Sequence, residues 1–242
     1  MRAETTSARR RAVIVSHGQP SEPEIGEAEI RTLAEAIVPF APDWDVRGAT
    51  LAGPGALEAA LAGAPDDLVV YPMFMADGWF TQDELPRRLG DAPARRLPPF
   101  GLDPALPGFA ADWLKAEIAS RGWSPATTRL FVAAHGSGRS KRPAEVTRAF
   151  AAALGAHLPL AETRCGFVEE EPYLADMARD LGQTSICLPF FAARRGHVLD
   201  DLPEALDEVG FAGIRLDPVG LHPGIPAFIA RRLQAAADAA LL

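Results

Sequence analysis

Residues 72–86 read PMFMADGWFTQDELP and residues 189–203 read PFFAARRGHVLDDLP, and the two stretches align without a gap. Each follows a short apolar run, which is typical of a strand that is buried on both faces of a parallel sheet. Each then reaches DELP or DDLP, where acidic residues followed by proline favour the start of a helix. The chain therefore contains the same connection from strand to helix twice.

Two further pairs of segments repeat in the same order. VIVSHG (13–18) aligns with FVAAHG (131–136), and PPFGLDPALPGF (98–109) aligns with DPVGLHPGIPAF (217–228). The offsets of all three pairs lie between 117 and 119 residues. Such regularity indicates a duplication, and the period is far too long for a solenoid of many repeats.

Each copy alternates apolar strands with helical stretches. In the second copy, Val146, Phe150 and Leu154 recur every four residues, the spacing of one helix face. Strands that alternate with helices of this length predict βαβ units and a parallel sheet. We therefore predict an α/β fold with two tandem Rossmann-like units, each a four-stranded parallel sheet flanked by helices, and an active-site cleft between them.

The repeats set the expected boundaries of the domains. We predict a flexible arm over 1–11, a first repeat over 12–121 and a second repeat over 129–242, joined by the Ser-, Gly-, Pro- and Thr-rich stretch at 120–128. The basic start lacks the apolar segment of a signal peptide.

Composition limits the class of partner. The 242 residues carry a formal net charge of −8, which argues against a nucleic-acid or anionic-membrane partner. Cys165 and Cys187 lie in apolar, strand-like runs, so we expect two core thiols and a reducing, cytoplasmic environment rather than a disulfide framework. Either a monomer or a homodimer is compatible with this composition.

Chemically distinctive residues follow the predicted strands. His17 and His135 come directly after the first strand of their copies, and Phe80 and His197 follow the third. Ligands of open α/β sheets bind beyond the carboxyl ends of the strands, so these positions lie on the functional edge of each unit.

The ordered motifs of the second copy resemble those of the class II tetrapyrrole chelatases. They are His-Gly-Ser at 135–137, FVEEEP at 167–172 and Gly-His-Val-Leu-Asp-Asp-Leu-Pro at 196–203. The resemblance implies insertion of Co²⁺ or Fe²⁺ into sirohydrochlorin or a related tetrapyrrole, for cobalamin or siroheme biosynthesis. It also implies no cofactor beyond the divalent metal substrate, and the donor types would accept Ni²⁺ as well.

The resemblance assigns His135, His197 and Glu169 as the catalytic residues and metal ligands. Imidazole binds late first-row ions without the grip of a thiolate cluster, and its ordinary pKa lets it accept a proton near neutral pH. Glu170 and Glu171 remain alternatives to Glu169. Asp201 is expected to orient His197 or to cap the following helix.

A polycarboxylate such as sirohydrochlorin needs cations around it, and guanidinium groups match carboxylates in bidentate fashion. The expected substrate-binding residues, all at the predicted edges of the sheets, are Ser137, Arg139, Lys141, Arg142, Arg194, Arg195 and Phe80.

The first copy departs from the motif, because Phe80 stands in place of His197 and Ala52 falls near the position of Glu169. We expect its site to be degenerate, with His17 a structural residue. Trp79 and Phe80 are interpreted either as an apolar wall for the macrocycle or as core. His222 is expected at a capping position before the last helix.

Two other functions compete with metal insertion. The loss of ligands in one copy is compatible with a catalytically weak homologue that carries a tetrapyrrole or a metal. A strand that ends in His-Gly is also found in histidine phosphatases, but there Arg normally precedes the histidine. Here Ser16 and Ala134 stand in that position, which argues against a phosphatase.

Overall fold

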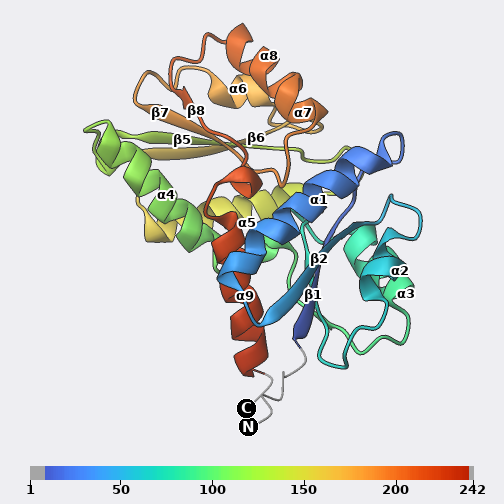
Figure 1. Cartoon of the computed structure of the whole chain (residues 1–242). Coiled ribbons are helices and arrows are strands. Elements are labelled where there is room, and N and C mark those ends of the chain that lie inside the picture. The colour runs from blue at the N-terminus through green and yellow to red at the C-terminus, as the bar shows by residue number, and fades with distance from the viewer. Residues whose placement is uncertain (1–8, 240–242) are drawn as a thin grey trace. The chain divides into compact units, whose positions relative to one another are not determined.

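The computed structural model describes residues 9–239 (Figure 1). Most of the predicted arm, residues 1–8, lies outside the described part. Its last two residues are not an arm, because Arg10 and Arg11 begin strand β1 (Arg10–Ser16) and pair with Trp44 and Asp45.

Two four-stranded sheets form the framework, and every strand pair in them is parallel. The strand orders are β2-β1-β3-β4 and β6-β5-β7-β8, so both copies have the same topology and the two predicted four-stranded parallel sheets are confirmed. Besides β1, the strands are β2 (Trp44–Thr50), β3 (Val69–Pro72), β4 (Arg95–Arg96), β5 (Arg129–Ala134), β6 (Glu162–Phe167), β7 (Ser185–Pro189) and β8 (Ile214–Arg215).

The compact units of the chain differ from the sequence repeats. Unit 1 comprises residues up to Met73, Trp79–Pro98 and residues from Gly224 onward, and unit 2 comprises Phe74–Gly78 and Pro99–Pro223. The last helix of the first repeat, α4 (Leu106–Ser120), thus belongs to unit 2, and the last helix of the second repeat, α9 (Ile225–Ala239), belongs to unit 1.

The other helices lie in the unit of their own strands. In unit 1 they are α1 (Pro23–Ile37), α2 (Ala56–Leu61), the π-helix η2 (Phe80–Glu84) and α3 (Leu85–Leu89). In unit 2 they are α5 (Arg142–His157), α6 (Leu174–Ala178), α7 (Gly196–Leu199) and α8 (Asp201–Glu208). Short 3₁₀ turns are η1 (Val38–Phe40), η3 (Phe100–Leu102), η4 (Pro125–Thr127) and η5 (Val219–Leu221).

In unit 1, α1 and α9 lie on one face of the sheet and α2 and α3 on the other (Figure 1). Gly48 of β2 is essential to this packing, because a Cβ there would lie 2.4 Å from the carbonyl oxygen of Ile30 in α1. The fully buried run Ala12–Val15 of β1 fits a strand that is covered on both faces.

In unit 2, α6 and α8 cover one face of the sheet, while α4 and α5 pack together on the other (Figure 1). Successive β5 side chains point to opposite faces of the sheet, since side chains in a strand alternate in direction. Phe131 and Ala133 join the cluster beneath α6 and α8 together with Leu174, Leu202 and other apolar residues. Burial of both faces holds the carboxyl ends of β5, β6 and β7 in a fixed arrangement.

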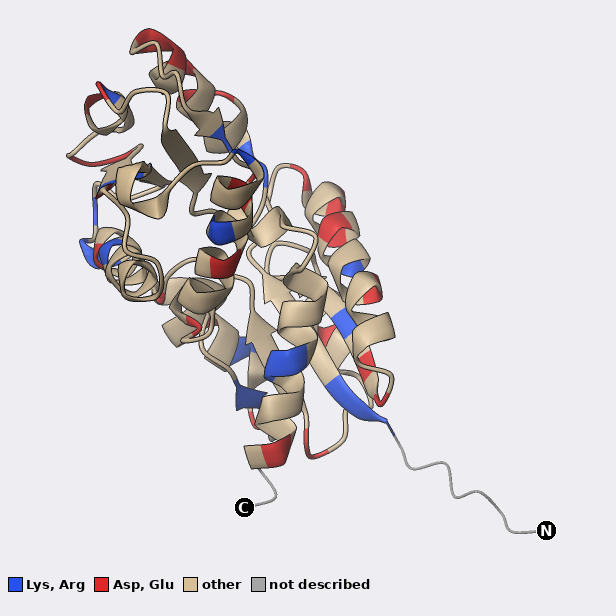
Figure 2. Ribbon diagram, turned by 90° about the vertical axis from the view of Figure 1, so that its left-hand side faces the viewer, with Lys and Arg blue, Asp and Glu red and all other residues tan. Residues whose placement is uncertain are grey.

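The charged surface is mixed. Figure 2 shows acidic and basic residues interspersed along the helices rather than gathered into one basic face. Cys165 and Cys187 are both free thiols, and burial raises the pKa of Cys187 to about 12. Within residues 9–239, no helix is both long and apolar enough to cross a membrane.

Candidate metal centre

His135 begins a tight turn at the carboxyl end of β5. The next residue, Gly136, has a φ of +67°, a conformation that side chains with a Cβ rarely adopt, and an added Cβ would lie 2.8 Å from the Cβ of Phe167. Nδ1 of His135 lies 3.0 Å from the carbonyl oxygen of Gly136. Because that carbonyl only accepts, Nδ1 is the donor in this hydrogen bond, and in the neutral ring Nε2 then has the lone pair.

His197 lies in α7, the first helix after β7. Its Nδ1 lies 2.9 Å from Oδ2 of Asp201, four residues further along. A carboxylate accepts and does not donate, so Nδ1 is again the donor, and in the neutral ring Nε2 of His197 has the lone pair. Asp201 thus makes the orienting contact that was one of its two predicted roles.

Glu169 joins these histidines from the turn that follows β6. The two imidazole rings lie with centroids 4.4 Å apart and planes at 87°, and Oε2 of Glu169 is 4.0 Å from Nδ1 of His135. One donor atom from each of the three residues lies within 4.8 Å of the others, and no second such group of His, Cys, Asp or Glu occurs in residues 9–239.

The structure separates the three consecutive glutamates. Glu169 lies among the histidines, Oε1 of Glu170 accepts a hydrogen bond from the backbone N of Ser137, and Glu171 is exposed. Two imidazoles and one carboxylate suit Fe²⁺, Co²⁺ or Ni²⁺, and three ligands leave coordination positions open. All three side chains are partly exposed, between 37% and 47%, so an incoming ion and a bulky partner can reach them.

The predicted cations of unit 2 fall into two groups. Within the described residues, the exposed side chains of Arg139 and Lys141 form no ion pair. Arg194 pairs with Asp217. Ser137 and Arg139 also share the turn after His135, where the backbone N of Arg139 donates to Oγ of Ser137 at 3.2 Å.

Arg142 has a partner that the sequence did not reveal. Its Nε and Nη2 donate to the two carboxylate oxygens of Asp77, at 2.5 and 3.0 Å, and this hydrogen bonding lowers the pKa of Asp77. Asp77 lies in the first sequence repeat, but its segment Phe74–Gly78 is part of unit 2. Arg142 is therefore already engaged by a carboxylate, and no local sequence signal indicates this pair.

Unit 1 reproduces the geometry of this edge with other side chains. The backbone N of Ala52 donates to the carbonyl oxygen of His17 at 2.9 Å, as that of Glu169 does to His135 at 3.0 Å. The Phe80 ring lies 4.0 Å from the His17 ring at 74°, as His197 lies against His135. The three donor positions are thus occupied in unit 1 by His17, Ala52 and Phe80. Of these side chains, only that of His17 can bind a metal ion.

The aromatic residues beside His17 are on the surface. Trp79 is 60% exposed and Phe80 is 37% exposed, which excludes the interpretation that this pair belongs to the core. The ring of His222, predicted at a capping position, packs against Phe109 and Trp113 of α4, and burial lowers its pKa.

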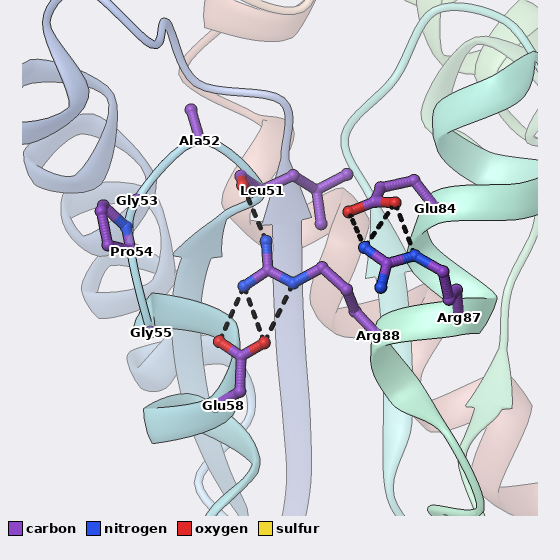
Figure 3. A pocket seen from close by; sticks show the side chains of 9 residues that line it. All are labelled: Leu51, Ala52, Gly53, Pro54, Gly55, Glu58, Glu84, Arg87 and Arg88. Carbon is purple, nitrogen blue, oxygen red and sulfur yellow. Dashed lines mark hydrogen bonds and ion pairs between the residues drawn. The ribbon is translucent and has the colours of Figure 1, made fainter.

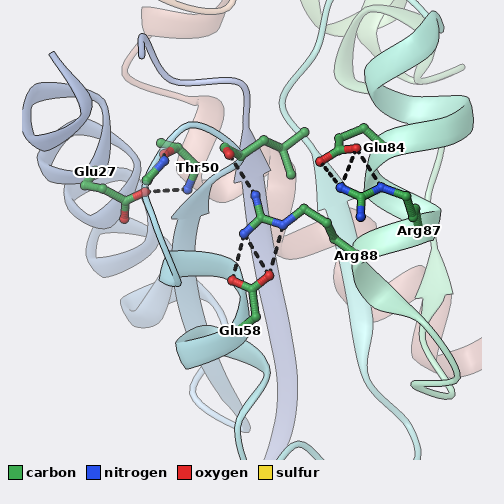
Figure 4. Close-up of polar contacts among 8 residues, drawn as sticks. Glu27, Thr50, Glu58, Glu84, Arg87 and Arg88 are labelled. Atoms are coloured by element: carbon green, nitrogen blue, oxygen red, sulfur yellow. Dashed lines mark hydrogen bonds and ion pairs between the residues drawn. The ribbon is translucent and has the colours of Figure 1, made fainter. Parts of the chain in front are cut away.

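Unit 1 also has a cavity of about 400 Å³, formed by the Leu51–Gly55 loop and by Glu58, Glu84, Arg87 and Arg88 (Figure 3). Its charges are paired. Arg88 binds Glu58 at 2.7 Å and the carbonyl of Leu51, and Arg87 binds Glu84 at 2.7 Å (Figure 4). The cavity holds no His or Cys, so its side chains offer no match to the donors of unit 2.

Known proteins resemble the chain in sequence and in fold. The CbiX family model matches residues 129–236. A solved structure of CbiX, described as the terminal enzyme for biosynthesis of siroheme in denitrifying bacteria, is 50% identical, with a TM-score of 0.83 over 94% of this chain and 99% of that one. A comparison with curated protein sequences gives no significant match.

More distant structures share the fold. SirB from Bacillus subtilis, solved with Fe³⁺, is 14% identical, with a TM-score of 0.73 over 95% of this chain and 96% of that one. A multi-domain protein of Deinococcus radiodurans with structural similarity to chelatases is 22% identical, with a TM-score of 0.71 over 95% of this chain and 55% of its own.

The two four-stranded parallel units and the 50% identity to CbiX define the chain as a class II metal chelatase. Within that class the chain belongs to the CbiX family, as the 50% identity over nearly its whole length shows.

Proposed function

We propose that this chelatase inserts Fe²⁺ or Co²⁺ into sirohydrochlorin and that His135, His197 and Glu169 hold the incoming metal. The observation that carries the proposal is the convergence of these three donors, from the ends of three neighbouring strands, within 4.8 Å of one another. The choice of sirohydrochlorin as the substrate rests on the 50% identical relative, which is described as an enzyme of siroheme biosynthesis. Because siroheme is an iron complex, that description favours Fe²⁺ as the physiological metal.

The donor set suits an ion that must be released again. Both histidines have Nδ1 occupied by a protein acceptor and Nε2 free to bind a metal. A Cys₄ site would hold the ion too tightly and would leave no open position. The partly exposed imidazoles and Glu169 instead bind a partly hydrated ion, so that pyrrole nitrogens replace protein donors one at a time.

Metal transfer and proton removal balance at the same two nitrogens. Insertion breaks two pyrrole N–H bonds and forms bonds between the metal and the macrocycle. As the metal leaves His135 and His197, each Nε2 recovers a lone pair and accepts one of the two protons. The Asp201 carboxylate, 2.9 Å from Nδ1, stabilises the imidazolium form of His197, and both protons then pass to water.

The carboxylates of the substrate are assigned to cations on the same turns. Arg139 and Lys141 are exposed and form no ion pair in the described residues, so they bind first, together with the hydroxyl of Ser137. Arg195, which already has a contact within the protein, is assigned to the same role. Arg194 and Arg142 contribute by exchanging Asp217 and Asp77 for substrate carboxylates. Phe80 and the neighbouring Trp79 offer exposed aromatic surface to the macrocycle.

The test is an anaerobic absorbance assay with sirohydrochlorin and Fe²⁺, Co²⁺ or Ni²⁺ in separate reactions. We expect insertion well above the rate in buffer, and loss of that acceleration in His135→Ala and His197→Ala. His17→Ala is the matched control, because it removes the equivalent histidine of unit 1, and it should retain most of the activity.

Two results would overturn the proposal. A wild-type protein that binds sirohydrochlorin without accelerating insertion of any of the metals would be a carrier rather than a chelatase. A loss of activity in His17→Ala that exceeds the loss in His135→Ala would move the metal centre to unit 1.

A further inference from the structure

Glu169 and Glu170 are neighbours in sequence, but their carboxylates act in different places. That of Glu169 lies beside His135, whereas Oε1 of Glu170 accepts a hydrogen bond from the backbone N of Ser137 at 2.9 Å. Glu170 also packs against the turn itself, since a Cβ on Gly136 would come within 3.0 Å of its Cγ and Oε1. Glu170 is thus a contact of the turn and lies outside the group of metal donors.

The hydrogen bond continues a ladder between two backbone segments that carry metal donors. The backbone N of Val168 donates to Ala134 at 3.1 Å, and that of Glu169 donates to the carbonyl of His135 at 3.0 Å. Within the described residues no backbone hydrogen bond joins these two segments beyond Glu169, and the side chain of Glu170 accepts from the backbone N of Ser137 instead. Removing it leaves the partly buried N–H of Ser137 without this acceptor and frees the turn that follows His135.

Unit 1 is linked differently at the same edge of its sheet. There too a carboxylate accepts a backbone N–H, but it is that of Glu27 in α1, whose Oε1 accepts from the backbone N and from Oγ1 of Thr50 at 2.7 and 2.5 Å (Figure 4). Among the hydrogen bonds described for residues 9–239, no carboxylate reaches the turn after His17. The hydrogen bond between a carboxylate and the turn after the first strand of the copy therefore occurs in unit 2, which has the metal donors, and is not described in unit 1.

We propose that Glu170 is a positioning residue for metal capture. Its hydrogen bond to Ser137 sets the turn so that the imidazole of His135 stays within reach of Glu169 and His197. This inference rests on the metal centre of the proposed function, but it concerns a residue that does not touch the ion. Residues that orient metal ligands typically contribute 10–100-fold to metal affinity.

The test is a titration of each protein with Co²⁺ alone, followed by its visible absorption under anaerobic conditions, together with kcat and KM for insertion. Glu170→Ala removes the acceptor, and Glu170→Asp keeps the charge but draws the carboxylate back by one methylene. Both should weaken Co²⁺ binding about tenfold or more. Glu170→Gln keeps an acceptor oxygen at the same reach without the charge and should remain within about threefold of wild type.

Glu171→Gln is the matched control. It removes one charge from the adjacent, exposed residue, whose carboxylate forms no hydrogen bond or ion pair within the described part of the chain, and its Co²⁺ affinity should be unchanged. Thermal unfolding separates positioning from folding: the order of affinities should hold at a temperature where all variants are folded. If Glu170→Ala does not fold, the comparison of Co²⁺ affinity between Glu170→Asp and Glu170→Gln tests the positioning role.

The inference is overturned if Glu170→Gln loses as much affinity as Glu170→Asp or Glu170→Ala, which would make the charge decisive, or if all variants bind Co²⁺ like wild type. Failure of the proposed function looks different. A wild type that binds Co²⁺ but does not accelerate insertion would refute the chelatase activity and still leave the effect of Glu170 measurable.

Discussion

Unit 1 should acquire a metal site if its two missing donors are restored. In the double variant Ala52→Glu/Phe80→His, a carboxylate and an imidazole join His17 at the positions that Glu169 and His197 occupy in unit 2. The backbone already matches, because the hydrogen bond from Ala52 N to His17 O is 2.9 Å long and the Phe80 ring lies 4.0 Å from the His17 ring.

The structure sets the size of the expected effect. Wild type should bind one Co²⁺ per chain and the double variant two. The new site should be at least tenfold weaker than the native one, because Glu84, which stands four residues after Phe80 as Asp201 does after His197, is held by Arg87 at 2.7 and 3.0 Å. The stability cost should stay within about 1 kcal/mol, since Phe80 is more than one-third exposed.

The assay is equilibrium dialysis or calorimetric titration with Co²⁺, repeated in a background that carries His135→Ala. That background lowers the affinity of the native site, so the second site of Ala52→Glu/Phe80→His can be counted by itself. Phe80→His alone, with two donors, should bind more weakly than the double variant. The reasoning is refuted if the double variant binds a single equivalent, because the two edges would then not be equivalent.

Three further predictions follow from the contacts of the described residues. Gly136→Ala should destabilise the protein by about 1–3 kcal/mol in urea unfolding, owing to the φ of +67° and the 2.8 Å clash, whereas Gly138→Ala, with 3.6 Å to its nearest neighbour, should be close to neutral; equal effects would contradict the assigned turn. Trp79→Ala should weaken binding of metal-free sirohydrochlorin, measured by fluorescence, without lowering the melting temperature, and Trp79→Phe should restore it; unchanged affinity in Trp79→Ala would remove this residue from the substrate site. Arg142 lowers the pKa of Asp77 below its ordinary value of 3.8, so this pair stabilises the fold above that pH and its contribution fades as pH falls through the lowered pKa. The stability difference between wild type and Asp77→Asn should therefore be full at pH 7 and shrink below pH 3.8, and a difference independent of pH would contradict the ion pair.

The pattern of residues was sufficient to predict the duplication, the parallel sheets and the edge that carries the histidines. Apolar strands and helical periodicity are local signals, and they placed β5 and α5 close to where the structure has them. The alignment of the copies also matched Phe80 with His197 and put Ala52 near the position of Glu169, and the hydrogen bonds and ring contacts of both units show the same correspondence.

Other features depend on contacts between residues far apart in the chain. Helix α4 packs in unit 2 and α9 in unit 1 because of the apolar faces that each helix meets there. The two helices have similar sequences, so the periodicity of their apolar residues does not predict this difference. The pair of Asp77 with Arg142 arises because a short segment of the first repeat lies in unit 2. Separations of this kind leave no local signal.

The paired histidines show the same division. The sequence by itself determined that His135 and His197 follow neighbouring strands of the second copy, because strand order and the edge of a parallel sheet follow from local pattern and topology. Only the tertiary structure decided which of three consecutive glutamates joins them. A turn can direct each side chain differently, and the hydrogen bond from Ser137 to Glu170 places Glu170 against the turn while Glu169 lies beside His135.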